Sequence, residues 1–205
     1  LNTTDDSVIA VGSEALRMLG RTPGYIRAEF PLSNGVISDH MLTEVMIKEF
    51  LKRACKNFLV KHRVIICVPS AITDVEKRAL VEVVINSGGR KVFTIEEPIA
   101  AAIGAGIDIS KPRGTLVVDI GGGTTDISVI SLCEPVVDAS LKVAGDKFDE
   151  AIVKHVRKRH NILIGEKTAE KLKIEIGCAY PRDEELTLDV QGRNIITGLP
   201  STVTV

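Results

Sequence analysis

The chain has 205 residues, of which 44% are hydrophobic, and a formal net charge of −1. This length and apolar content allow a substantial core in one or two domains, and the near-neutral charge gives no indication of nucleic-acid binding. Aromatic residues are scarce and Trp is absent, which argues against a base-stacking surface. The four cysteines form no C-x-x-C pair, so neither a zinc site nor a disulfide framework is indicated. No apolar run approaches the roughly 20 residues of a membrane span, and no signal peptide is recognisable.

The first quarter of the chain carries patterns for short, alternating elements. Ser7–Val11 alternates weakly and predicts a strand, and Ser13–Leu19 predicts a short helix. Phe30–Val36 predicts a strand with a turn. Met41–Lys56 has apolar residues at helical spacing, which predicts a helix with one buried face.

Three apolar residues then stand between basic ones. Phe58, Leu59 and Val60 are preceded by Lys56 and followed by Lys61. A short apolar knuckle in a basic rim suits insertion among anionic lipid head groups. The alternative is that these residues simply begin the next strand, and the residues alone leave both interpretations open.

A strand–helix–strand pattern follows. Val64–Val68 is an apolar run of strand length, and Thr73 with Glu76 three residues later is a capping-box pattern that starts a helix. Val92–Ile95 predicts the next strand. This order predicts an α/β layer with a right-handed crossover.

A carboxylate stands at the junction of that strand with another helix. Glu97 precedes Pro98 and the small, apolar helix Ile99–Gly106. Glu97 could orient a water molecule for attack on a phosphate, or it could only favour the start of the helix, where acidic residues are common. Glu96 is interpreted as structural.

The most informative stretch is a predicted hairpin with a glycine-rich tip. Leu116–Val118 and Ile127–Leu132 are short, β-branched runs, and apolar residues on both faces of the second run predict a central strand. The tip lacks the lysine of a Walker loop, and no helix follows as a Rossmann fingerprint requires. The five tip residues are Gly121, Gly122, Gly123, Thr124 and Thr125.

Such a tip suits a phosphate. Glycines let backbone N–H groups approach a ligand closely, successive inward amides make an anion-binding nest, and Thr124 and Thr125 add hydroxyl donors. Asp119, at the end of the first strand, could hold a hydrated Mg²⁺, which prefers few carboxylates. The alternative is a flexible turn in an all-β domain.

The last third of the chain predicts a strand over Val136–Val143 and a helix over 150–159 that carries a basic run. Gly145 stands at the entry of that helix and could admit an anion close to the backbone. A further helix ends at Gly177.

The helix that ends at Gly177 carries two charged residues of interest, and a hairpin is predicted after it. Glu170 and Lys173 lie three apart on one helix face, which suits either a surface ion pair or a ligand contact. The hairpin is predicted with its turn at Gly192 and Arg193 and its return strand over Asn194–Thr197.

The sequence D-x-G-G-G-T-T-D on a hairpin resembles the second phosphate loop of the actin, sugar-kinase and heat-shock chaperone superfamily. VVDIGGGTTDISVISL, with IEEPIAAAIGAG before it and GEKTAEKLKIEIG after it, is similar to the MreB family of bacterial actin homologues. The resemblance runs through nearly the whole chain. It implies an α/β, actin-like ATPase (ribonuclease H-like) fold with two halves around a nucleotide cleft.

The resemblance also implies roles for particular residues. Glu97 matches the family's water-activating glutamate, and Glu97 and Thr124 would together hold the attacking water in line. Gly121–Thr125 match the phosphate loop. Gly145 and the following Asp146 match nucleotide-contacting positions. Two residues are assigned to the adenosine pocket, Glu170 to a ribose hydroxyl and Lys173 to ribose and base, and Asp119 to Mg²⁺ through water. The family's hydrophobic membrane loop falls on Phe58, Leu59 and Val60.

The implied function is that of a cell-shape-determining protein that binds and slowly hydrolyses ATP, with Mg²⁺, and guides cell-wall synthesis. It would polymerise into filaments at the cytoplasmic face of the cell membrane, with an anionic membrane surface, cell-wall elongation proteins and membrane scaffold proteins as partners. A chaperone-like or sugar-kinase-like ATPase and a non-catalytic interaction fragment are the alternatives.

The resemblance divides the chain into four partial subdomains, 1–31 (IB-like), 32–111 (IA-like), 112–147 (IIA-like) and 148–205 (IIB-like), with a hinge near Lys111–Gly114. The chain begins at Leu1 without a methionine and ends at Val205 inside an apparent strand, so we expect a fragment. The family's first phosphate loop and its glycine-rich adenosine loop are not found in these residues. We therefore expect the chain alone to bind ATP weakly or not at all.

Overall fold

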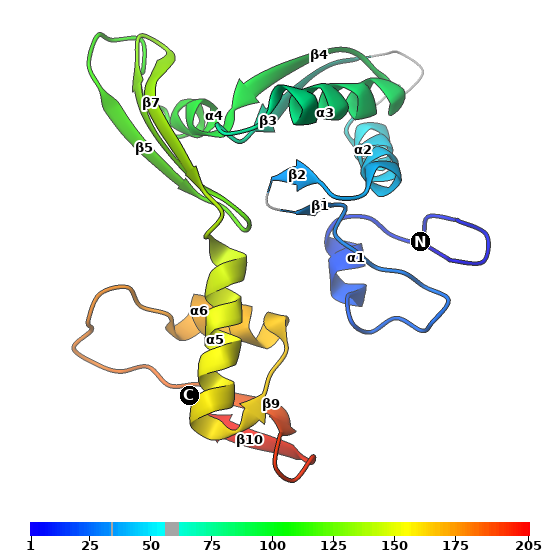
Figure 1. The fold of residues 1–205 in the computed structure, drawn as a ribbon, viewed down its shortest axis with the longest axis vertical. Coiled ribbons are helices and arrows are strands. Elements are labelled where there is room, and N and C mark those ends of the chain that lie inside the picture. The colour runs from blue at the N-terminus through cyan, green and yellow to red at the C-terminus, as the bar shows by residue number, and fades with distance from the viewer. Residues whose placement is uncertain (34, 56–61) are drawn as a thin grey trace. The chain divides into compact units, whose positions relative to one another are not determined.

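The structure is a computed structural model that describes residues 1–33, 35–55 and 62–205 (Figure 1). The chain forms two compact units. Unit 1 comprises Leu1–Asp119 and Asp126–Ser140, and unit 2 comprises Ile120–Thr125 and Leu141–Val205. The linker 111–114 lies inside unit 1, and the four-subdomain division stays a prediction.

The N-terminal part of unit 1 is held by few elements. Helix α1 (Ser13–Met18) buries none of its residues, and the two-residue strands β1 (Leu32–Ser33) and β2 (Val36–Ile37) pair antiparallel. The predicted strand over Ser7–Val11 is wrong, because that segment has no ladder partner. The N-terminal pairing is instead an isolated bridge between Asn2 and Ile26.

A β–α–β unit forms the next part of unit 1, as predicted. Strands β3 (His62–Val68) and β4 (Gly89–Glu96) pair in parallel and are joined by α3 (Asp74–Asn86). The predicted capping box is present, with both the Thr73 side chain and the Glu76 side chain accepting a backbone N–H. Helix α2 (His40–Ala54) packs against α3 (Figure 1), and Asp39 caps its start by accepting from Leu42 N.

The predicted hairpin belongs to a three-stranded sheet in the order β5-β6-β7, formed by Thr115–Ile120, Thr125–Ser131 and Glu134–Leu141. The middle strand is β6, which is buried or half-buried at every position, so the central-strand prediction is confirmed. Helix α4 (Glu97–Gly104) packs on this sheet through Ala102, which clusters with Ile109 and Ile130.

The turn between β6 and β7 has an unusual backbone. Leu132 and Cys133 both have positive φ, at 53° and 65°. Two consecutive positive-φ residues are what a type I′ hairpin turn requires, and Asn-Gly is the pair that usually supplies them. Here the two positions carry a branched apolar residue and a cysteine.

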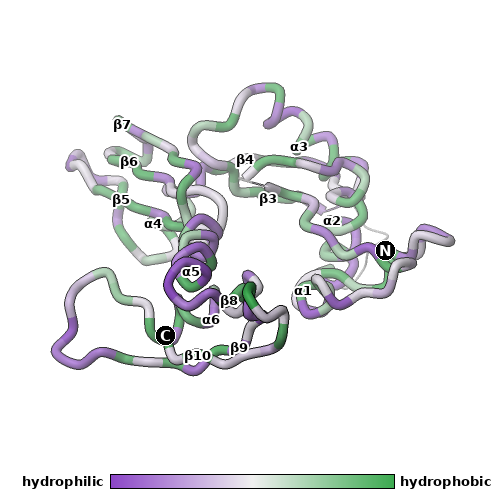
Figure 2. Tube along the Cα trace, turned by 60° about the horizontal axis from the view of Figure 1, so that its bottom comes forward, coloured by the Kyte–Doolittle hydropathy of each residue, from purple (hydrophilic) through white to green (hydrophobic). Residues whose placement is uncertain are grey.

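Unit 2 has its own apolar core. Helix α5 (Gly145–His160) packs on α6 (Glu166–Ile176), with the three-stranded sheet β10-β9-β8 beside them. The strands are β8 (Ile162–Leu163), β9 (Asp189–Asn194) and β10 (Pro200–Thr204). Six residues are buried together: Val156, Ile162, Ile164, Ala169, Leu172 and Val190. The basic run of α5 lies on the surface apart from Val156, and α5 is largely hydrophilic in Figure 2.

The terminal hairpin exists, but its predicted turn is wrong. Gly192 lies inside β9 and pairs with Ser201 of β10. A Cβ at Gly192 would lie 2.4 Å from Ile162 Cγ2 and 2.6 Å from the Leu163 carbonyl oxygen. The glycine is therefore present because β8 approaches the backbone there. The chain turns later, between Ile195 and Leu199.

Candidate functional site: a glycine loop on a helix N-terminus

The glycine-rich tip is a closed loop in unit 2. Gly121 N donates to the Thr124 carbonyl oxygen over 2.9 Å, and Thr124 is only 8% exposed. The Thr125 hydroxyl donates to the Val143 carbonyl oxygen over 2.7 Å. The loop is therefore held at its base by hydrogen bonds.

The first amides of α5 hold the loop from the other side. Gly145 N donates to the Gly121 carbonyl oxygen over 3.1 Å, and Asp146 N donates to the Gly122 carbonyl oxygen over 2.9 Å. Ala144, the N-cap, supplies no side-chain acceptor, so these two carbonyls satisfy N–H groups that every helix start leaves unpaired.

The backbone amides of the loop that have no acceptor lie at its tip. In the part of the chain that the structure describes, the Gly122 and Gly123 N–H groups donate to no protein acceptor. Gly122 is exposed and Gly123 half-buried. Two successive glycine amides without a protein partner, next to a helix N-terminus, form the kind of concavity that binds anions.

Gly145 lies where three groups converge. A Cβ there would come within 3.3 Å of the Gly121 carbonyl oxygen and within 3.3 Å of Lys173 Nζ. These distances are tighter than ordinary carbon contacts, so a side chain would push the loop or the ammonium away. The glycine predicted from the sequence is thus needed for the approach of loop and lysine.

Lys173 reaches α5 from α6. Its ammonium donates to the Gly145 carbonyl oxygen over 3.1 Å and to Asp149 over 2.9 Å. Lys173 is therefore paired with Asp149, and the alternative of a surface pair with Glu170 does not describe it. Glu170 is exposed. Asp149 is 8% exposed and is not predicted from the sequence, because no local pattern links positions 24 residues apart.

Unit 1 carries the other predicted residues, Glu97 and Asp119. Glu97 is the first residue of α4 and is half-buried. Burial raises the pKa of its carboxyl group, and the charges of Asp126 and Asp119 raise it further. Glu97 therefore lies close enough to Asp126 and Asp119 for their negative charges to disfavour its ionised form, as in sites where acid–base groups are tuned.

Asp126 is a second residue that the sequence does not single out. It is 1% exposed, and its Oδ1 accepts from Ser70 N over 3.1 Å. Within the described residues, its Oδ2 has no hydrogen-bond partner, and neither do the buried hydroxyl groups of Ser70 and Ser128. Buried polar atoms are nearly always satisfied, so this cluster has unused capacity for a polar ligand or water.

The predicted membrane loop and metal site are the remaining predictions. Phe58, Leu59 and Val60 lie outside the described residues. Among the residues that are described, no helix is long and apolar enough to cross a bilayer. The same residues contain no group of three or more His, Cys, Asp or Glu side chains placed to hold a metal ion.

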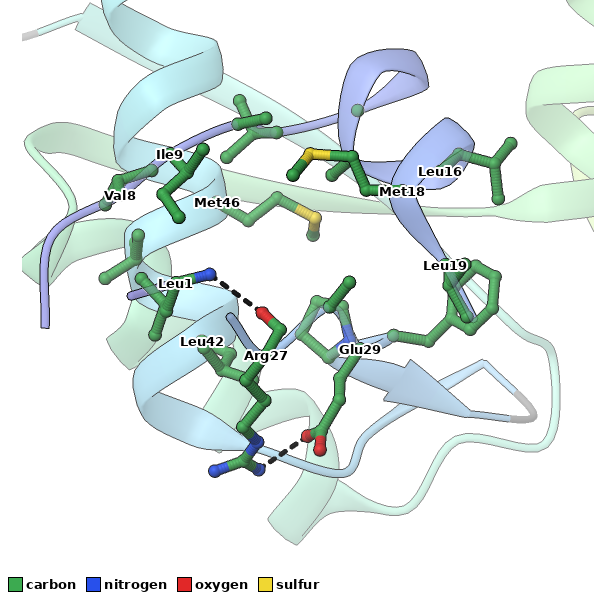
Figure 3. A pocket seen from close by; sticks show the side chains of 18 of the residues that line it. Leu1, Val8, Ile9, Leu16, Met18, Leu19, Arg27, Glu29, Leu42 and Met46 are labelled. Atoms are coloured by element: carbon green, nitrogen blue, oxygen red, sulfur yellow. Dashed lines mark hydrogen bonds and ion pairs between the residues drawn. The ribbon is translucent and has the colours of Figure 1, made fainter. Parts of the chain in front are cut away.

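A cavity of about 290 Å³ lies elsewhere in unit 1. Its wall is apolar and comes from α1, α2 and the segments around them, with an Arg27–Glu29 ion pair on its border (Figure 3). The described site residues predicted from the sequence line no part of this cavity.

Known structures define the class of protein. MreB5 of Spiroplasma citri bound to AMPPNP superposes with a TM-score of 0.92 at 40% identity, over 100% of this chain and 62% of that one. The MamK double helical filament has a TM-score of 0.79 at 22% identity, over 94% of this chain and 58% of that one. The chain has the actin-like α/β fold, as the sequence predicted.

The family follows from the sequence comparisons. The family described as MreB/Mbl protein matches residues 1–205. Cell shape-determining protein MreB of Escherichia coli K12 is 51% identical over 196 residues, which are 95% of this chain and 56% of that protein. Mbl of Bacillus cereus is 49% identical over 97% of this chain and 60% of its own length. The chain belongs to the MreB/Mbl family and spans somewhat more than half the length of these relatives.

Proposed function

We propose that this chain is part of an ATP-hydrolysing, filament-forming cell-shape protein, in which the Gly121–Thr125 loop binds the phosphates of the nucleotide. The observation that carries the proposal is the pair of unpartnered amides at Gly122 and Gly123, beside the α5 N-terminus. Related MreB5 structures bound to AMPPNP and to ADP support a nucleotide as the ligand. The family match favours this function over a chaperone-like or sugar-kinase-like one.

The remaining nucleotide would extend from the loop along unit 2. Gly145 and Asp146 lie next to the loop through their amides, which supports contact with the phosphates or the sugar. Glu170 is exposed on α6 and would accept from a ribose hydroxyl, and Lys173 would direct its free N–H toward the ribose.

Glu97 and Thr124 are proposed to orient the water that attacks the terminal phosphate. A carboxyl group whose pKa is raised by burial and by neighbouring charges suits a proton acceptor that works near neutral pH. Catalysis of phosphoryl transfer is mostly positioning and charge stabilisation, which matches a site without a nucleophilic side chain.

We infer a magnesium ion at Asp119. Asp119 and Asp126 raise the pKa of Glu97 by their negative charge, and a hard cation would relieve this repulsion. Asp119 is proposed to hold Mg²⁺ through water, where the ion would neutralise charge on the phosphates. Mg²⁺ keeps most of its waters in such sites.

Assembly and location are proposed from the relatives. The MamK filament has the same fold, and the curated relatives are named as cell shape-determining proteins. We infer head-to-tail filaments at the inner face of the cell membrane, with cell-wall elongation and scaffold proteins as partners. The contact with anionic lipid is assigned to Phe58, Leu59 and Val60.

The test is phosphate release from Mg·ATP by the full-length gene product. Glu97→Ala is expected to lower kcat on the order of 100-fold with little change in KM, because it removes a group that acts on the water. Glu96→Ala is the matched control, since Glu96 is the adjacent carboxylate and has no assigned role. Equal rates for Glu97→Ala and the unsubstituted protein would refute the catalytic assignment.

A further inference from the structure

We propose that Asp149 and Lys173 form a clamp that positions the phosphate loop, so that Lys173 acts on nucleotide binding mainly through the loop. The clamp consists of three consecutive links. The Lys173 ammonium donates to the Asp149 carboxylate and to the Gly145 carbonyl oxygen. The Gly145 amide in turn donates to the Gly121 carbonyl oxygen. This inference rests on the proposed role of the loop in binding phosphate.

The lysine is committed to α5 by its geometry. An ammonium group has three N–H donors, and two of them are directed to Asp149 and the Gly145 carbonyl oxygen. One donor is left for a ribose hydroxyl. A ribose contact is therefore compatible with the clamp, but it would use only one of the three donors of the ammonium group, and the other two are directed to α5.

Because Asp149 and Lys173 are largely buried, removing one of the two charges is unfavourable. The side chain of Asp149 is 12% exposed and that of Lys173 is 28% exposed. Removing either charge leaves the other partly buried without its partner, which is far less favourable than keeping the pair. The carboxylate also lies one helical turn from Gly145, so the ammonium bridges the start of α5 and its second turn.

The absence of a side chain at Gly145 completes the clamp. A Cβ at this position would crowd both Lys173 Nζ and the Gly121 carbonyl oxygen. The ammonium and the loop can therefore approach the same residue from two sides. A movement of Lys173 is transmitted to Gly121 through one residue.

Binding of two ligands distinguishes the two roles of Lys173, as part of the clamp or as a ribose contact. Mg·ATP has a ribose, whereas Mg·tripolyphosphate offers only the phosphates. In the full-length gene product, Asp149→Asn and Lys173→Met are both expected to weaken both ligands about tenfold or more, because a misplaced loop loses its phosphate contacts. Lys173→Arg keeps the charge and is expected to restore part of the affinity.

The matched controls are Glu150→Gln, on the same helix as Asp149, and Lys171→Met, on the same helix as Lys173. Both residues make only surface ion pairs, and both variants are expected to bind as the unsubstituted protein does. If Lys173→Met weakens Mg·ATP alone and Asp149→Asn weakens neither ligand, Lys173 is a ribose contact and the clamp is wrong.

Hydrogen exchange in the full-length gene product tests the clamp without any ligand. Asp149→Asn is nearly isosteric, and far-UV circular dichroism reports whether it folds. The amides of Gly121, Gly145 and Asp146, which donate to carbonyl oxygens of the loop, are expected to exchange at least about tenfold faster in this variant than in Glu150→Gln, because the loop opens locally. Unchanged exchange would overturn the clamp. If the unsubstituted protein binds neither ligand, the proposed function fails, and this measurement alone decides the clamp.

Discussion

The two units differ in how their interiors are filled. Unit 2 packs six buried apolar residues into one continuous cluster between two helices and a sheet. In unit 1, the N-terminal helix α1 buries nothing and borders an apolar cavity, and the strand β6 carries buried polar atoms without partners. Unit 2 therefore holds its loop on an apolar core with one buried carboxylate oxygen, Asp149 Oδ1, that has an ion-pair partner but no hydrogen bond within the described part of the chain. The unsatisfied polar atoms of unit 1 instead gather around Asp126.

The largest predicted difference in stability is between leucine-to-alanine substitutions in the two units. Leu172 is 2% exposed in the core of unit 2, and Leu16 is 45% exposed at the cavity of unit 1. Leu172→Ala is expected to destabilise unit 2 by about 3 kcal/mol, because it leaves a cavity in a filled core. Leu16→Ala should cost less than about 1 kcal/mol.

Hydrogen exchange resolved by unit is the appropriate measurement, since a chain with two units need not unfold in one step. Equal protection losses in Leu172→Ala and Leu16→Ala would show that the two interiors are packed alike, contrary to the comparison.

A smaller effect is expected from adding one methyl group. Gly192→Ala places Cβ within 2.6 Å of the backbone of β8, so it should destabilise unit 2 by about 2 kcal/mol through overpacking. A methyl group added at Gly104 in α4 would meet no atom within 4 Å. Gly104→Ala should stabilise unit 1 by roughly 0.5–1 kcal/mol. Urea unfolding followed by circular dichroism gives both values, and a stable Gly192→Ala variant would contradict the close approach of β8.

The smallest effect is a pH dependence in unit 1. The pKa of Glu97 is raised above the usual 4.5, so the folded state favours the protonated carboxyl group. The stability that this group contributes is complete below pH 4.5 and is lost as the pH rises through the raised pKa. Glu97→Gln stays neutral and should be more stable than the unsubstituted chain at pH 7, with no difference under acidic conditions.

Glu82→Gln, an exposed carboxylate of α3, controls for the loss of one charge. A Glu97→Gln variant that is less stable at pH 7 would mean that the ionised carboxylate is favourably paired, against the repulsion inferred from Asp126 and Asp119.

Local signals account for what the sequence predicts correctly. The capping box at Thr73 and Glu76, the hairpin around Gly121–Thr125 and the central position of β6 all depend on residues within a few positions of one another. Such patterns act through backbone geometry that is the same in any fold. They are sufficient to predict the α/β fold and the glycine loop.

Contacts between distant residues account for what the sequence does not predict. The bond from Ser70 N to Asp126 joins positions 56 apart, and no periodicity links them. Gly192 has the pattern of a turn residue, although the backbone of β8 is what requires a glycine there. Ser7–Val11 alternates as a strand would, but a strand also needs a neighbour with which to pair.

The turn at Leu132 and Cys133 has a consequence for engineering. Both residues adopt left-handed backbone conformations, which for residues with a Cβ cost roughly 1–2 kcal/mol each. Asparagine and glycine would relieve that strain without altering any residue of the proposed nucleotide site. A directed-evolution campaign for thermal tolerance should therefore accumulate its first substitutions in this two-residue connection.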